Sequence, residues 1–308
     1  MKNFALISLI ISLTAIAGCS WLGSDESNGS ENTNDGFTER EFYEKIQRSL
    51  NSQNWSVAIN NLQLLESQFP FGKYAEQSQL ELIYAQYMSA DYESSIVSAE
   101  RFIRLHPQHP NVDYAFYVKG LCELSQSTRL FSGYIPIDQS RRDIGTAREA
   151  FATLGELLSK FPNSPYAPDA RKRLINLRNQ LARSEINIAN YYFSRGALVA
   201  AAKRGQHVVE NFQQSPAVAD GLAVMAQAYH MMGNQSLADN AVEVLATNYP
   251  DYPLLDENNQ FAYNSRMLYP SNWFLSKITL GLVKQSVPPA FDTRAIYNKV
   301  AQQDKKAK

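Results

Sequence analysis

Residues 55–70 read WSVAINNLQLLESQFP, and the pattern inside this stretch decides the fold. Small Ala58 is followed at helical spacing by apolar Leu62 and Leu65, and the stretch closes on an aromatic residue and Pro70. A proline at that point cannot continue a helix. A small residue at a helix crossing, apolar residues four and seven positions later, and a proline stop are typical of the second helix of a tetratricopeptide repeat.

The same pattern recurs four more times along the chain. The further helix stops are His106-Pro107, Phe161-Pro162, Phe212-Gln213 and Tyr249-Pro250. Counting back 12 positions from the second residue of each stop gives only small residues, namely Ala58, Ser95, Ala150, Ala201 and Ala238. Counting back eight and then five positions gives Leu62, Ala99, Leu154, Gly205 and Val242, and then Leu65, Phe102, Leu157, Val208 and Leu245. The sequence therefore predicts an all-α fold of five tetratricopeptide-like helix-turn-helix repeats over residues 37–250, stacked into a short superhelix.

The two middle repeats are longer than the others. Successive stops are 37, 55, 51 and 37 residues apart, whereas a standard repeat has about 34 residues. In the third repeat we expect a first helix from about Asp113 to Leu124, with Gly120 at its close-packing position, a surface loop over Ser125–Arg141, and a second helix from about Arg142. In the fourth repeat the extra length falls in a first helix from about Tyr166 to Tyr192.

The amino terminus has the layout of a secretory signal. An apolar run over Phe4–Ala17 is too short to span a bilayer comfortably and follows a single positive residue. It ends in Ile16-Ala17-Gly18-Cys19, which resembles the lipobox of bacterial lipoproteins. An ordinary signal peptide with an incidental cysteine is the alternative.

The lipobox resemblance implies a lipid anchor. It makes residues 1–18 a lipoprotein signal peptide and gives Cys19 an S-diacylglycerol group and an N-acyl chain, with no other cofactor expected. Three acyl chains hold a protein at a membrane far more firmly than one. Residues 19–36 are polar and are expected to form a lipidated flexible tether. Ser20 after the cysteine implies the periplasmic face of the outer membrane.

Composition excludes several classes of protein. The chain is 44% hydrophobic and 19% charged, as expected of globular proteins, and 29 basic against 30 acidic residues argue against a nucleic-acid binder. Two cysteines are too few for a disulfide scaffold or a four-cysteine zinc site, so Cys122 is expected to be a small buried residue. Phosphate-binding and catalytic motifs are absent from the sequence. His106 and His109 fall in a turn, so we predict no enzyme activity, no catalytic residue and no metal site.

Several strings outside the general repeat pattern point to one family. They are Trp55-Ser56-Val57-Ala58-Ile59, Phe69-Pro70-Phe71-Gly72-Lys73-Tyr74, Arg101-Phe102-Ile103-Arg104-Leu105-His106-Pro107, Pro162-Asn163-Ser164 and Lys172-Arg173-Leu174. They resemble the BamD family of lipoproteins, the five-repeat component of the outer-membrane β-barrel assembly machine. The resemblance runs from the lipobox to about Pro250. It implies a non-enzymatic scaffold and client-recognition subunit whose partners are unfolded outer-membrane proteins, the periplasmic domains of BamA, and BamC and BamE-like lipoproteins.

A groove lined by tyrosines is the predicted client site. The first helices of such repeats face a concave groove that holds extended peptides or a partner's surface. In this chain the first of these helices carries Tyr43. The resemblance implies that this groove receives the aromatic C-terminal segment of unfolded outer-membrane proteins, with a cation near the peptide carboxylate. The candidate residues are Tyr74, Tyr84, Tyr87, Tyr114, Tyr117 and, as the cation, Arg104. The alternative is that these tyrosines only pack at the edge of the core.

A second candidate surface lies in the last two repeats. Nine basic and four acidic residues fall between Arg141 and Arg183, which indicates either a solvated helix face or electrostatic docking of a partner domain. The resemblance places the contacts with BamA, BamC and BamE in this half of the chain. The candidate partner-binding residues are Tyr191, Tyr192, Arg195 and Arg204.

Residues 251–308 extend beyond the resemblance. They contain an apolar run over Trp273–Val283 that ends at Pro288-Pro289. We expect a helix that caps the open end of the repeat array, and the alternative is an amphipathic segment on the membrane or on a partner. The competing function for the whole chain is that of another periplasmic tetratricopeptide lipoprotein, acting in pilus secretin assembly or in the coordination of cell-wall synthesis.

Overall fold

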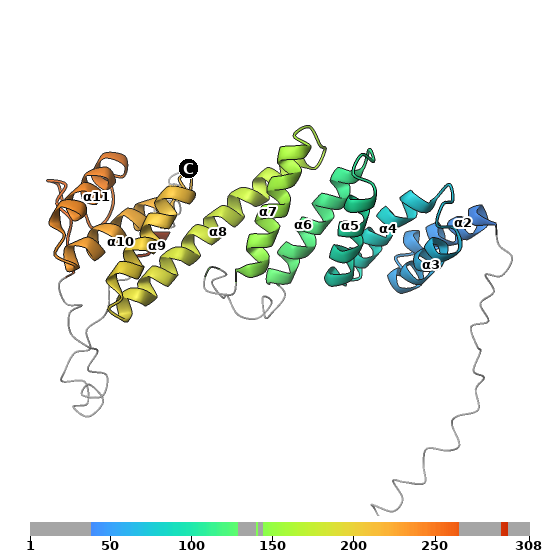
Figure 1. Cartoon of the computed structure of the whole chain (residues 1–308), viewed down its shortest axis with the longest axis horizontal. Helices are drawn as coiled ribbons and strands as arrows, with labels where there is room; N and C mark the ends of the chain where they lie inside the picture. Colours follow the sequence, from blue (N-terminus) through green and yellow to red (C-terminus); the bar gives the residue numbers. More distant parts are fainter. Residues whose placement is uncertain (1–37, 129–139, 141–143, 265–290, 295–308) are drawn as a thin grey trace, which may run out of the picture.

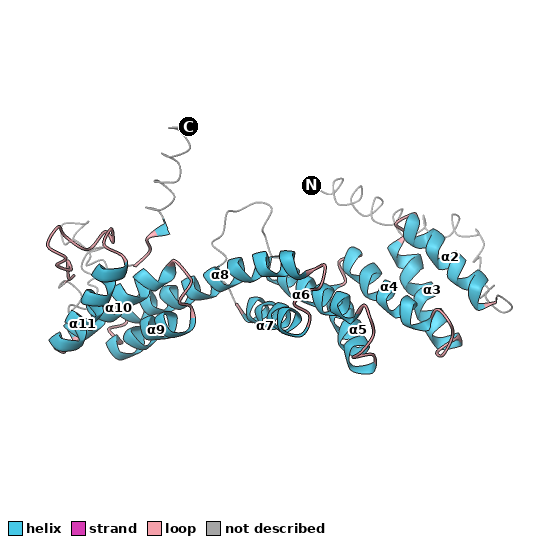
Figure 2. Cartoon of the chain, turned by 90° about the horizontal axis from the view of Figure 1, so that it is seen from above, coloured by secondary structure: helices cyan, strands magenta, loops and turns pink. Residues whose placement is uncertain are grey.

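The computed structural model describes residues 38–128, 140, 144–264 and 291–294, and these form an elongated array of helices (Figures 1 and 2). Within the described residues the helices pair in chain order: α2 (Glu39–Asn51) with α3 (Trp55–Gln68), α4 (Ala75–Met88) with α5 (Tyr92–Leu105), α6 (Val112–Thr128) with α7 (Gly145–Lys160), α8 (Ala167–Ser194) with α9 (Leu198–Asn211), and α10 (Ala217–Met231) with α11 (Gln235–Asn248). The predicted all-α fold of five helix pairs is confirmed.

Each second helix ends at the predicted stop. The residue before the proline, or before Gln213, caps the helix and donates its backbone N–H to the carbonyl four residues earlier. The small residue 12 positions before each stop is fully buried in all five pairs. Because a small side chain lets two helix backbones approach, this position sets the crossing point of each pair. The five apolar residues nearest the stops, from Leu65 to Leu245, are also fully buried.

The third repeat departs from the predicted boundaries. Helix α6 continues through Ser125–Thr128, so the predicted loop is wrong over these four residues. They contain neither glycine nor proline, and nothing in their sequence ends the helix. Helix α7 begins at Gly145, while the predicted start at Arg142 and most of the loop lie outside the described residues. The close-packing role of Gly120 is confirmed, because a Cβ there would lie 2.6 Å from a methyl carbon of Leu154.

Helices α9 and α10 make an unusually close backbone contact. A Cβ added at Gly205 would lie 2.6 Å from the carbonyl oxygen of Gly221, and a Cβ at Gly221 would lie 3.1 Å from that of Gly205. We expect Gly205→Ala to lower the free energy of unfolding by about 1–3 kcal/mol, since backbone cannot move aside as a side-chain tip can. Urea unfolding would measure this change in the free energy of unfolding. Gly155→Ala in α7 is the control, because a Cβ there meets nothing within 4 Å. An equal loss in both variants would contradict the close contact as the cause.

Cys122 is fully buried in α6, as predicted. Burial raises the pKa of its thiol to about 11, so the reactive thiolate is scarce near neutral pH. In a soluble form of the protein that lacks Cys19, we expect no reaction with a thiol reagent at pH 8 and full reaction in guanidinium chloride. Rapid labelling of the folded protein would show that this part of α6 opens.

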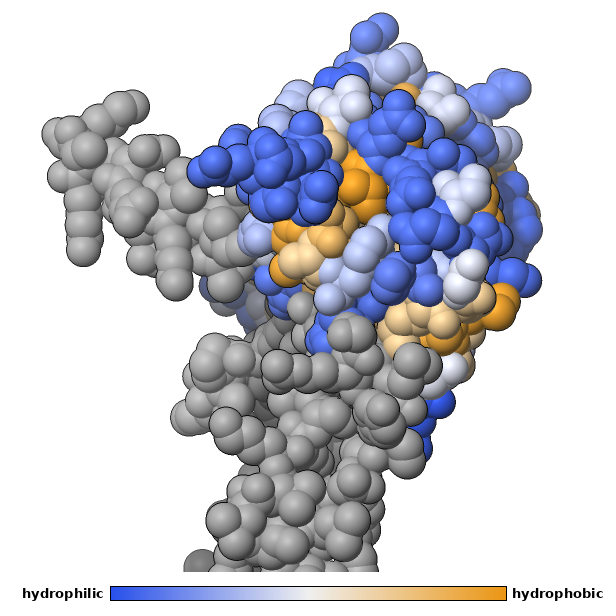
Figure 3. Space-filling view, turned by 90° about the vertical axis from the view of Figure 1, so that its left-hand side faces the viewer, coloured by the Kyte–Doolittle hydropathy of each residue, from blue (hydrophilic) through white to orange (hydrophobic). Residues whose placement is uncertain are grey.

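The described part of the C-terminal extension folds back onto the last two repeats. Tyr252, Phe261 and Phe291 are buried in one apolar cluster with residues of α8, α9 and α10. The end of the array beside α11 shows apolar residues among polar ones (Figure 3). The predicted capping helix around Trp273–Val283 lies outside the described residues. Among the described helices, none has the length and hydropathy needed to cross a bilayer.

Candidate functional site

Two pairs of stacked tyrosines join the first helices of neighbouring repeats. The rings of Tyr43 in α2 and Tyr74 before α4 lie 4.2 Å apart and are nearly parallel, at 8°. The rings of Tyr117 in α6 and Tyr166 before α8 lie 4.7 Å apart at 15°. Tyr74 and Tyr166 each follow a helix-stop proline by four residues. The turn that follows each proline therefore places the ring of Tyr74 or Tyr166 against the first helix of the preceding repeat.

A carboxylate holds each pair in position. Glu81 accepts hydrogen bonds from the Tyr43 hydroxyl at 2.6 Å and from the amides of Gln47 and Gln77 at 2.8 and 3.0 Å. Burial and then the bond to Glu81 raise the pKa of Tyr43, so this phenol stays protonated as a donor. With the hydroxyl and the stacking contact both fixed, the rings form a rigid, half-buried aromatic surface.

The second pair has the same arrangement. The Tyr117 hydroxyl donates to Asp169 at 2.8 Å, and Arg173 donates to the same carboxylate oxygen. Burial and the bond to Asp169 raise the pKa of Tyr117. Because this carboxylate also pairs with an arginine, this end of the aromatic surface carries little net charge.

The remaining predicted tyrosines lie on α4 and α6, the first helices of the second and third repeats. Tyr84 is 39% exposed and meets the edge of Trp55 at 5.7 Å. Tyr87 lies 5.8 Å from Tyr92 on the next helix, and Tyr114 lies 5.7 Å from Tyr166. Tyr87, Tyr114 and Tyr117 also pack against the core of the second and third repeats. The packing interpretation therefore describes part of their contacts, while Tyr84 is open to solvent.

Arg104 does not share a helix with any of the predicted tyrosines. It lies on α5, a second helix, is exposed, and makes no hydrogen bond or ion pair with the described residues. Lys73 places a cation beside one of the tyrosines, because its Nζ lies 5.6 Å from the centre of the Tyr74 ring. Tyr166, Glu81 and Asp169 are candidate functional-site residues that were not predicted from the sequence. One feature of the sequence could have indicated Tyr166. It follows a helix-stop proline by four residues, as Tyr74 does.

The second candidate surface contains one exposed pair. Tyr191 is 54% exposed near the end of α8, and Arg195 lies over its ring at 5.3 Å and donates to its hydroxyl at 3.2 Å. Tyr192 lies 6.0 Å from Tyr191 and packs against the core of the last two repeats. A rigid aromatic ring with a bound cation is suited to a protein interface.

Arg204 has a partner within the chain. It donates to Glu185 at 2.8 Å, and Glu185 is 3% exposed and lies 3.9 Å from Arg148 of α7. The hydrogen bond to Glu185 raises the pKa of Arg204. Through this carboxylate the side chain links α9 to α8, while 39% of it stays exposed. Arg204 therefore has a structural role within the chain, and its role in partner binding stays a prediction.

Much of the basic excess is used inside the molecule. Six of the basic residues form ion pairs or hydrogen bonds, namely Arg148 with Glu185, Lys160 with Glu156, Arg171 with the Pro162 carbonyl, Arg173 with Asp169, Arg178 with Gln214, and Arg183 with Asp220. These contacts favour a structural role for the charge over a docking patch.

The two turn histidines face one carboxylate. His106 Nδ1 and His109 Nε2 lie 3.4 and 3.6 Å from the two oxygens of Glu76. Both rings also contact Phe102. Over residues 38–128, 140, 144–264 and 291–294, no group of three or more histidine, cysteine or acidic side chains is arranged to hold a metal ion.

Comparison with known proteins gives one family. The family model described as "Outer membrane lipoprotein", YfiO, matches residues 36–245. The proteins named outer membrane protein assembly factor BamD from Xylella fastidiosa strain Temecula1 and Neisseria meningitidis serogroup A are 37% and 38% identical over 81% of this chain, covering 83% and 93% of their own lengths. The BamD of Vibrio cholerae is 32% identical over 80% of this chain and 99% of its own length. The chain belongs to the outer membrane lipoprotein family that contains the BamD assembly factors.

Proposed function

We propose that this chain is a non-enzymatic scaffold and client-recognition subunit of the outer-membrane β-barrel assembly machinery. The observation that carries the proposal is its similarity, over four fifths of its length, to proteins named as outer membrane protein assembly factors. Diacylglycerol and acyl groups on Cys19 hold it at the periplasmic face of the outer membrane, and residues 19–36 tether the repeat array to that anchor.

The tyrosine surface binds the aromatic C-terminal segments of unfolded outer-membrane proteins. The geometry supports this proposal, because Tyr74 and Tyr117 are held by stacking and Tyr84 of α4 is exposed. Rigid aromatic rings lose little conformational entropy on binding and bury large areas. Lys73, next to Tyr74, is the cation for the terminal carboxylate of the bound segment.

The carboxyl end of α8 and the start of α9 bind the other subunits. These are the periplasmic domains of BamA and BamC and BamE-like lipoproteins. Tyr191 and Arg195 supply an exposed aromatic and cationic pair there, and Arg204 has an exposed part.

A pull-down of the tagged, lipidated protein from its native membrane in mild detergent tests the function. We expect recovery of a large β-barrel protein with periplasmic repeat domains. Recovery of a pilus secretin or of peptidoglycan enzymes instead would overturn the proposed function.

The same pull-down tests Arg204. We expect Arg204→Ala to reduce recovery of the barrel subunit at least fivefold, because a charged interface contact is lost. Glu185→Gln is the matched control, because it breaks the same internal ion pair and leaves the arginine in place. Reduced recovery in both variants would assign the effect to the internal pair, and full recovery with Arg204→Ala would contradict a partner contact.

A further inference from the structure

One face of α8 carries a row of four side-chain amides and one arginine. Asn176, Gln180, Arg183, Asn187 and Asn190 follow one another at steps of four, three, four and three residues, so they lie along one face of this 28-residue helix. Asparagine and glutamine side chains present one donor group and one acceptor group side by side, as a peptide group does.

The carboxyl half of this row binds main chain of the protein itself. Asn190 donates to the carbonyl of Phe291 at 3.2 Å and accepts from its N–H at 3.0 Å. Asn187 donates to the carbonyl of Ser140 at 3.2 Å. In α10, Gln227 makes the same two-bond contact with the main chain of Asn264, at 3.2 and 2.9 Å. Amide side chains therefore bind polypeptide backbone at three places in this molecule.

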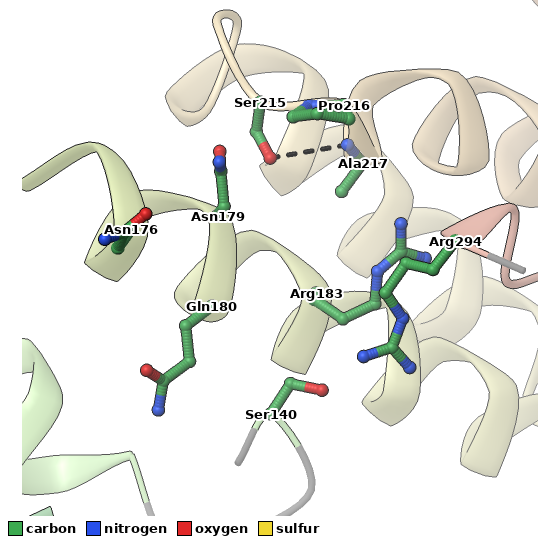
Figure 4. Close-up of a pocket in the computed structure, with 9 residues that line it drawn as sticks. All are labelled: Ser140, Asn176, Asn179, Gln180, Arg183, Ser215, Pro216, Ala217 and Arg294. Atoms are coloured by element: carbon green, nitrogen blue, oxygen red, sulfur yellow. Dashed lines mark hydrogen bonds between the residues drawn. The ribbon is translucent and has the colours of Figure 1, made fainter. Parts of the chain in front are cut away.

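The amino half of the row holds no main chain within the described residues. Asn176, Asn179 and Gln180 line a cavity of about 540 Å³, and the rest of its wall is formed by Ser140, Arg183, the Ser215–Ala217 turn and Arg294 (Figure 4). The Oδ1 atom of Asn179 is buried and has no hydrogen-bond partner among the residues that the structure describes. A buried acceptor without a partner is unfavourable, and a bound donor would satisfy it.

The row also connects to the tyrosine surface. Continued toward the amino end of α8 at the same spacing, it reaches Arg173 and then Asp169, which accepts from Tyr117. From Asp169 to Gln180, before the positions that hold the protein's own main chain, the helix rises about 16 Å, the length of about five residues of extended chain. Arg173 and Arg183 are paired with Asp169 and Asp220, so the row offers hydrogen bonds without a strong net charge.

We infer that Asn176, Asn179 and Gln180 bind the main chain of an extended polypeptide, the segment of an unfolded outer-membrane protein that precedes its aromatic end. The inference rests on the proposed function and adds the way the segment is held. The tyrosines select the aromatic end, and the amides of α8 hold the preceding residues through backbone groups that every sequence shares. One site then accepts clients of different sequence.

The test is the affinity of a fluorescent 16-residue peptide with the sequence of the C-terminal strand of an outer-membrane β-barrel protein. We expect Asn176→Leu with Gln180→Leu to bind it about tenfold more weakly than the unaltered protein, from two or more lost hydrogen bonds. Asn60→Leu with Gln63→Leu, on exposed amides of α3, is the matched control. Equal thermal midpoints establish that both variants fold. Affinity of the α8 variant within twofold of the unaltered protein would overturn the inference.

A backbone-modified peptide separates main-chain from side-chain recognition. Methylation of alternate amide nitrogens outside the aromatic end removes donors and keeps the side chains. We expect this peptide to bind the unaltered protein about tenfold more weakly and to lose little more with the α8 variant. If the loss from methylating the peptide and the loss from the α8 substitutions add fully, the inference is overturned, because the substitutions would then weaken binding without involving the peptide's backbone amides.

Photo-crosslinking distinguishes this inference from the proposed function. A benzophenone side chain is placed at Gln180 or at Tyr84, and the same peptide is added. Crosslinks at both positions support both ideas. Crosslinks at Tyr84 alone overturn the role of α8 and leave client recognition standing, and crosslinks at neither position overturn both.

Discussion

Asp220→Ala is expected to lower the free energy of unfolding by about 3–5 kcal/mol, because it leaves a buried arginine without its main counter-ion. Asp220 is fully buried in α10 and pairs with Arg183 of α8. Its other oxygen accepts from the Tyr252 hydroxyl at 2.9 Å. Thr293 donates to the carboxylate through its N–H and its hydroxyl, at 3.3 and 3.1 Å. One side chain therefore joins two repeats to both described parts of the C-terminal extension.

Urea unfolding followed by circular dichroism would measure this loss. Limited proteolysis would show whether the C-terminal extension is released in Asp220→Ala. We expect faster cleavage of the extension in this variant, because the bonds to Tyr252 and Thr293 keep it docked. Asp220→Asn should lose less than the alanine variant, since an amide oxygen can still accept. Glu156→Ala is the control, because its partner Lys160 is exposed and such pairs contribute at most about 1 kcal/mol. A loss below about 1 kcal/mol for Asp220→Ala would contradict the role of this carboxylate as a link.

The repeats were predictable because their signal is local. A small residue, two apolar residues and a stop fall within 13 residues, and each describes contacts between adjacent helices. The network of Asp220 has no such signal. Its partners Arg183, Tyr252 and Thr293 lie 37, 32 and 73 residues away, so only the folded chain shows that an acidic residue inside an apolar helix is paired.

The candidate site was predictable in part for the same reason. The family resemblance indicated Tyr74, and the expected first helix of the third repeat indicated Tyr117. Their partners come from neighbouring repeats: Tyr43 is 31 residues from Tyr74, and Asp169 is 52 residues from Tyr117. The role of Arg104 as the cation of this site stays a prediction. Arg104 follows the buried Phe102 by two residues, which is about 200° around the helix.

Replacing one tyrosine of each stacked pair is the largest expected change in client binding. We expect Tyr74→Ala with Tyr117→Ala to weaken binding of the C-terminal strand peptide about 100-fold, close to 1.4 kcal/mol for each ring removed. Each substitution removes an aromatic contact and also the stacking partner that orders Tyr43 or Tyr166. Fluorescence anisotropy with the labelled peptide would measure the change.

The controls separate a binding role from a packing role for these rings. Tyr74→Phe with Tyr117→Phe keeps both stacks and removes only the hydroxyls, including the bond to Asp169, so we expect affinity within about fivefold of the unaltered protein. Tyr191→Ala removes an exposed tyrosine at the far end of α8 and should leave peptide affinity unchanged. If the double alanine variant unfolds at a lower urea concentration but binds the peptide with unchanged affinity, these rings pack the array and the client surface lies elsewhere. If affinity falls while the folded array persists, the stacked tyrosines are the aromatic part of the client site.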